Sequence, residues 1–127
     1  TPSDDKSSIE TAGNFFLDFR AERDKTRNQE IELLDSIINN KDTDKDTLKD
    51  AQQQKLEITQ AMEKEVTIEG LVKAKGISDV VVTLHKGSVN VIVDEPELTE
   101  AQVAQILDIV TRETDEKAEN IKIIPAN

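Results

Sequence analysis

The sequence predicts an α+β protein in which N-terminal helical segments precede an α-β-β-α-β unit with a three-stranded sheet. Two observations carry this prediction. The first half of the chain is strongly charged and helical in character, whereas two alternating Val-rich runs later straddle a Lys-Gly step. We therefore expect a flexible linker over residues 1–13, polar helical segments over residues 14–55, and the α-β-β-α-β domain over residues 56–127.

The N-terminal part has few residues that a core could bury. Residues 1–13 are rich in Ser, Asp and Thr, a composition typical of a linker. A helical pattern runs over residues 14–40 and places Phe15 and Phe19 four positions apart, but the stretch "RAERDKTRNQE" that follows them is almost entirely polar. A helix that is polar all round either bridges solvent or awaits a partner.

A second helix is expected from Asp44 to about Lys75. Thr43 or Asp44 would be its N-cap and Gly76 its C-cap. Its first half is polar, so only the second half is expected to pack on the sheet. The apolar face of that half consists of Ile58, Ala61, Met62, Ile68, Leu71 and Val72.

The two Val-rich runs predict a β-hairpin. Apolar residues alternate over Val80–His85 and again over Val89–Asp94, the pattern of two strands with one richer face. Lys86 and Gly87 lie between them, and glycine provides the positive φ that a two-residue turn needs.

A helix and a third strand follow the hairpin. Thr99 and Gln102 form a capping box at the start of a helix predicted over about Glu100–Glu116. A third strand is predicted near Ile121–Ile124, where Pro125 ends it. The helix would cover one sheet face with a stripe made of Val103, Ile106, Leu107 and Val110.

The composition excludes several classes of function. With 27 acidic and 16 basic residues the formal charge is −11, which disfavours binding to nucleic acid or to anionic lipid. The chain has no cysteine, so disulfides and thiolate metal sites are excluded. No apolar run is long enough to span a membrane. The opening "TPSDDKSS" resembles a cut inside a linker, so we expect the chain to be a portion of a longer protein.

One short motif resembles a calcium-binding loop. Asp42, Asp44 and Asp46 match the first three ligand positions of an EF-hand, but Thr47 replaces the glycine at the sharp turn. Gln53 stands where a bidentate glutamate should close the site. We interpret this stretch as a solvated turn between helices and expect no metal site.

No catalytic site is predicted either. His85 is the single histidine and lies beside the tip of the hairpin, where a nucleophile–base pair would lack an orienting group. We expect it to be a surface histidine, and we expect neither a cofactor nor enzymatic activity. The remaining interpretation is a binding or assembly module.

Nearly the whole chain resembles a known family. The stretch "KGISDVVVTLHKGSVNVIVDEPELTEAQVAQILDIVTRETDEKAENIKIIPAN", preceded by "LEITQAMEKEVTIEGLVKA" and by "FFLDFRAERDKTRNQEIELLDSIINN", is similar to the stage III sporulation protein AH family of endospore-forming bacteria. The resemblance implies that residues 56–127 form a ring-building motif. A flagellar basal-body ring protein and the inner-ring lipoproteins of needle-type secretion systems share that motif.

The resemblance also implies a cellular role. It implies an N-terminal membrane anchor, absent from this sequence, in the outer forespore membrane on the mother-cell side, with the soluble domain in the intermembrane space. The partners it implies are stage II sporulation protein Q, homo-oligomeric ring neighbours and other stage III sporulation channel proteins. Together they would form a ring-like channel that links mother cell and forespore. The alternative that stays open is a soluble adaptor whose helical hairpin docks a partner helix without any ring.

The predicted sheet has two edges where a partner could bind. Strand order first–second–third places Val80–His85 and Ile121–Ile124 at the edges, and Lys122 and Pro125 partly guard the third strand. The first strand has neither proline nor charge before His85. We predict that it adds to a sheet in the partner or in a neighbouring subunit. The residues that would make this contact are Val80, Val81, Val82, Thr83, Leu84 and His85. The alternative contact is the polar faces of the two N-terminal helices.

Overall fold

A computed structural model of the chain describes the backbone of residues 2–126 and the side chains of residues 15–126. The predicted α+β class and the order of its elements are confirmed. The elements are α1 (Pro2–Ile38), α2 (Lys45–Lys73), β1 (Val80–His85), β2 (Ser88–Val93), α3 (Glu100–Thr114), a 3₁₀ turn (Ala118–Asn120) and β3 (Ile121–Pro125). All predicted strand boundaries lie within one residue of the observed ones. None of the described helices has a stretch both long and apolar enough to cross a membrane.

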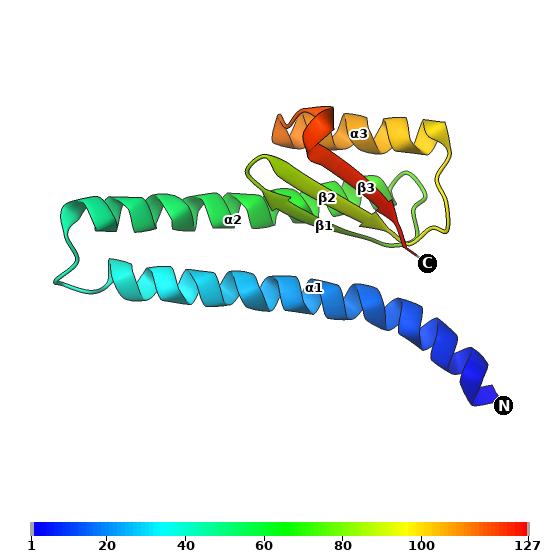
Figure 1. Cartoon of the computed structure of the whole chain (residues 1–127), viewed down its shortest axis with the longest axis horizontal. Helices are drawn as coiled ribbons and strands as arrows, with labels where there is room; N and C mark the ends of the chain where they lie inside the picture. The colour runs from blue at the N-terminus through cyan, green and yellow to red at the C-terminus, as the bar shows by residue number, and fades with distance from the viewer. Residues whose placement is uncertain (1, 127) are drawn as a thin grey trace.

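Helices α1 and α2 form an antiparallel hairpin whose turn lies far from the sheet (Figure 1). Asp44 is the N-cap of α2, and its carboxylate accepts a hydrogen bond of 3.2 Å from the Thr47 N–H. The Thr43 hydroxyl donates to the Ile37 carbonyl at 2.7 Å and fixes the other side of the turn. The Asp-rich stretch is therefore a capped turn, and no metal-binding cluster is present among the described residues.

The structure differs from the sequence prediction at both ends of this hairpin. α1 begins at Pro2, so residues expected as flexible linker are helical. Proline suits the first position of a helix, because an N–H at that position would have no acceptor within the helix. The C-cap of α2 is Ala74, and Gly76 adopts its left-handed φ of 99° in the turn beyond it. The domain boundary expected at residue 56 lies inside α2, which is one continuous helix, as the sequence predicts for Asp44 to about Lys75.

The sheet has the strand order β1-β2-β3. β1 and β2 are antiparallel with Val82 opposite Val91, and β2 and β3 are parallel with Val91 opposite Ile123. The β1–β2 turn is tight because Gly87 has a φ of 79°. α3 connects β2 to β3 by a crossover, and its start has the predicted capping box of Thr99 and Gln102. As a result, β1 and β3 are the two edges of the sheet.

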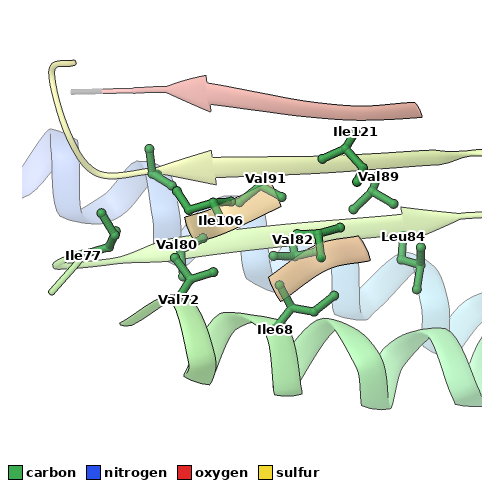
Figure 2. Close-up of a cluster of buried hydrophobic side chains, with 12 residues drawn as sticks. Ile68, Val72, Ile77, Val80, Val82, Leu84, Val89, Val91, Ile106 and Ile121 are labelled. Atoms are coloured by element: carbon green, nitrogen blue, oxygen red, sulfur yellow. The ribbon is translucent and has the colours of Figure 1, made fainter. Parts of the chain in front are cut away.

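The main core lies between one face of the sheet and two helices (Figures 1 and 2). Figure 2 shows Ile68 and Val72 of α2 and Ile106 of α3 pointing toward the strands. The buried members of this core are Ile68, Val72, Ile77, Val80, Val82, Leu84, Val89, Val91, Val93, Ile106, Val110 and Ile121. The prediction that only the second half of α2 packs on the sheet is confirmed, because the α2 residues of this core are Ile68 and Val72, with Ala61 at its margin.

A smaller cluster covers the opposite face of the sheet. Phe16 of α1 packs on Val81 and Ile92, and Phe19 and Ala126 lie at its margin. Phe16 is 2% exposed, so the first turns of α1 with described side chains are firmly docked. This contact brings α1 alongside β1 and positions the polar stretch that follows Phe19 next to the edge of the sheet.

Candidate interaction site at the two edges of the sheet

The carbonyl groups on the outer edge of β1 accept hydrogen bonds from α1. In a strand, alternate residues direct both their N–H and their C=O to the same side, and in β1 the outward residues are Val80, Val82 and Leu84. Their three carbonyl oxygens accept hydrogen bonds of 2.9, 2.7 and 2.9 Å from Arg20, Arg23 and Arg27, in that order.

The N–H groups on the same edge donate to carboxylates. Val80 N–H donates to Asp79 Oδ1 at 2.8 Å. Val82 N–H donates to Glu69 Oε2 at 2.9 Å, and Leu84 N–H donates to Glu65 Oε2 at 2.8 Å. Each carboxylate is also paired with an arginine of α1. We call these six side chains the edge clamp: Arg20, Arg23, Arg27, Glu65, Glu69 and Asp79.

The spacing of the clamp residues follows from helical and strand geometry. Positions 20, 23 and 27 are separated by three and four residues and so lie on one face of α1, and Glu65 and Glu69 lie one turn apart on α2. One helical turn rises about 5.4 Å. Two strand residues span about 6.6 Å. Long arginine and glutamate side chains can span the small difference between these two repeats, so side chains of two helices can form hydrogen bonds along one strand.

The clamp is largely buried and strongly charged. Burial raises the pKa of Glu65 above its ordinary value, although hydrogen bonds from Leu84 and the charges of Arg27 and Arg23 oppose this. Its Oε1 is buried and accepts no hydrogen bond from any described residue; Arg23 Nε lies 3.8 Å away. For Arg23, burial lowers the pKa, but the hydrogen bond and charge of Glu69, the hydrogen bond to Asp24 and the charge of Glu65 together outweigh it, and the net direction is upward. The most solvated pair is Arg20–Asp79.

The prediction that β1 has a free edge is wrong. All six outward N–H and C=O groups of Val80, Val82 and Leu84 are occupied, so a partner strand cannot pair with them while α1 is in place. Of the six residues expected to bind a partner, Val80, Val81, Val82 and Leu84 are buried; only Thr83 and His85 have accessible side chains. Contact of a partner with β1 stays a prediction for those two side chains alone.

The other edge of the sheet is open. Ala126 N–H donates to the Val93 carbonyl, so by alternation Lys122 and Ile124 also face β2, whereas Ile121, Ile123 and Pro125 face outward. The Ile121 N–H donates to the Ala118 carbonyl, and Pro125 has no N–H. No described residue bonds the outward N–H and C=O of Ile123. This residue therefore offers one free donor and one free acceptor at the middle of β3.

An apolar groove runs beside this open edge. Its volume is ≈ 420 Å³, and it lies between β3, α3 and the segment that enters α3. Its lining consists of Pro96, Glu97, Leu98, Val103, Leu107, Ala118, Ile121, Ile123 and Pro125. On the opposite face of β3, Ile124 is 41% exposed. A strand laid along β3 would therefore meet apolar surface on both of its faces.

Comparison with known proteins identifies the family and the fold. The model of the family described as SpoIIIAH-like protein matches residues 2–123. No curated protein matches the chain significantly. A chain of the solved SpoIIQ-SpoIIIAH pore forming complex is 18% identical with a TM-score of 0.74, over 88% of this chain and 98% of that chain. The type III secretion system protein EscJ of enteropathogenic E. coli is 30% identical with a TM-score of 0.51. That match covers 57% of this chain and 50% of EscJ.

Proposed function

The chain belongs to the SpoIIIAH-like protein family, and from this membership we propose that it is an extracytoplasmic structural subunit of a ring-like channel that links mother cell and forespore during sporulation. The observation that carries the proposal is the family match over residues 2–123, which includes both the helical hairpin and the sheet domain. The likeness to a chain of a pore forming complex and to a secretion-system protein supports a structural role over an enzymatic one.

The proposed partner is a SpoIIQ protein on the forespore side, because the similar solved chain belongs to a complex with SpoIIQ. We place the contact on β3 and the adjoining groove. The outward N–H and C=O of Ile123 supply strand pairing, and the groove accepts apolar side chains that project from one face of the incoming strand. The closed edge at β1 supports this choice, since β3 is the edge left for pairing.

The proposed location is the space between the two membranes, with attachment to the outer forespore membrane through an N-terminal anchor. Tethering of many copies in one membrane raises their local concentration, which would offset the repulsion between subunits that each carry a charge of −11. Ring neighbours and other stage III sporulation proteins would then assemble around this domain.

The second candidate function is an adaptor whose helical hairpin docks a partner helix. It is favoured by two large apolar side chains on the outer part of the hairpin, because Leu33 and Leu56 are 64% and 51% exposed. In this case the partner would bind the hairpin and leave β3 untouched.

A binding titration with the SpoIIQ protein of the same organism tests the proposal. Replacing Ile123 by proline removes the free amide of β3, and Ile123→Val is the matched control that keeps it. We expect Ile123→Pro to weaken binding at least ~10-fold relative to Ile123→Val. Equal affinities of the two variants, together with a loss of binding in Leu33→Lys or Leu56→Lys, would favour the adaptor instead.

A further inference from the structure

The edge clamp satisfies the polar backbone groups of an edge strand with side chains instead of with another strand. Burying charged pairs is costly, and apolar residues of similar volume often stabilise a protein as well as a buried ion pair does. An apolar cover could not bond the six polar groups of the β1 edge, however, whereas three arginine–carboxylate pairs bond all of them. The clamp therefore takes the place of a fourth strand while leaving no new edge behind it.

We infer that the edge clamp blocks polymerisation: without it, β1 of one copy would pair with β3 of a second copy of this chain. Two features support a second copy as the occupant. The outward groups of Ile123 are open, and β1 would expose six groups of the same kind without the six clamp side chains. Both edges are mainly apolar and flank the same core, and the one charged residue of β3, Lys122, would meet no like charge among Val80–Leu84 of β1.

The relative orientation of the strands also fits. β3 is parallel to β2, and β2 is antiparallel to β1, so β3 and β1 run in opposite directions within one sheet. If a second copy is displaced along the sheet without being turned over, its β1 meets β3 of the first copy antiparallel, with the helices of both on the same face. That contact is heterologous and leaves one free edge at each end, so it repeats without closing.

The consequence concerns how subunits can be joined. With β1 closed, a copy has one edge for pairing and cannot extend a sheet in both directions. A partner strand on β3 then binds one copy only, and contacts between neighbouring copies must use other surfaces. The clamp thus separates partner binding from uncontrolled sheet growth.

The test is sedimentation of the full chain across protein concentration at moderate salt, where the repulsion of like charges is screened. The clamp variant carries Arg23→Met, Arg27→Met, Glu65→Met and Glu69→Met, which removes the donors to the Val82 and Leu84 carbonyls and the acceptors of their N–H groups. We expect its weight-average mass to rise at least ~2-fold over that of the wild type and to keep rising with concentration. Adding Ile123→Pro should return it to the wild-type mass.

Hydrogen exchange at Val82 and Leu84 reports whether the β1 edge has opened. A milder variant, Arg20→Ala with Asp79→Ala, opens only the Val80 end and is the one to use if the clamp variant does not fold. Its expected increase in mass is smaller and is also abolished by Ile123→Pro. Three results overturn the inference. The first is fast exchange at Val82 and Leu84 in a clamp variant that keeps the wild-type mass. The second is association of the clamp variant that persists after Ile123→Pro is added. The third is slow exchange at Val82 and Leu84 in a clamp variant of wild-type mass. SpoIIQ is absent from this experiment, so its outcome is independent of the proposed partner.

Discussion

Arg27 and Glu65 form a buried ion pair, with Nη2 and Oε2 3.0 Å apart, and both groups also bond the same strand residue. The arginine donates to the Leu84 carbonyl at 2.9 Å, and the carboxylate accepts from the Leu84 N–H at 2.8 Å. One residue of a neighbouring strand would supply the same donor and the same acceptor. The pair thus reproduces the hydrogen bonding of a strand from side chains on two helices.

Replacing Arg27 by methionine should be strongly destabilising. The change leaves the Glu65 carboxylate buried without its nearer ion partner and the Leu84 carbonyl without its donor. We expect the free energy of unfolding to fall by roughly 3–5 kcal/mol, measured by urea denaturation at neutral pH.

Lys55→Met is the control for that measurement. Lys55 also forms an ion pair, with Nζ 2.6 Å from Asp35 Oδ1, but both side chains are about two-fifths exposed. Loss of this exposed pair should lower the free energy of unfolding by less than about 1 kcal/mol. Similar losses in the two variants would mean that the Arg27 pair does not close the edge of the sheet.

The stability of the wild type relative to Glu65→Gln should depend on pH in a defined direction. Burial raises the pKa of Glu65 in the folded state above the ordinary 4.5. The folded state therefore holds this proton more tightly than the unfolded state does. As the pH rises from 4.5 through the folded pKa, the wild type should lose stability relative to Glu65→Gln. Urea denaturation of both proteins at a series of pH values measures the difference; a rise with pH would contradict it.

Asp79→Asn should give the opposite slope. Burial raises the pKa of Asp79, but bonds from Arg20, the Val80 N–H and Lys73 outweigh it and lower the net pKa below 3.8. The stability due to the carboxylate is present above that pH and is lost as the pH falls through the folded pKa. The advantage of the wild type over Asp79→Asn should therefore shrink in acid, in the same denaturation series. A constant advantage would show that Asp79 is not bonded as an ion.

Phe16 should anchor α1 to the second face of the sheet. It is 2% exposed against Val81 and Ile92, and Phe16→Ala should cost about 3 kcal/mol in thermal or urea unfolding. Leu17 is 62% exposed, so Leu17→Ala should change stability by no more than about 0.5 kcal/mol. A small effect at Phe16 would indicate that the clamp alone holds α1 in place.

The local elements could be predicted from the sequence because their signals are local. The alternation of Val80–His85, the glycine at position 87 and the capping box at Thr99 each depend on neighbours in the chain, and all three are observed. The main core followed from the same patterns, since the apolar faces of α2 and α3 must cover one face of a small sheet.

The closed edge of β1 could not be read in the same way. Five of its six hydrogen bonds join residues 13 to 60 positions apart. The polar stretch of α1 looked solvated because it has almost no apolar residue. A signal was nevertheless present. Arg20, Arg23 and Arg27 lie on one helix face, and Glu65 and Glu69 lie one turn apart on the next helix, a complementary pattern that a long polar helix does not need in solvent.

Amide hydrogen exchange with and without SpoIIQ tests the central claim most directly: β1 is the closed edge of the sheet and β3 is the edge that binds. In the free chain the amides of Val82 and Leu84, bonded to Glu69 and Glu65, should exchange slowly, and the outward amide of Ile123 should exchange fast. Addition of SpoIIQ should slow exchange at Ile123 and leave Val82 and Leu84 unchanged. Fast exchange at Val82 and Leu84 in the free chain, or protection by SpoIIQ at those two residues and not at Ile123, would contradict the account.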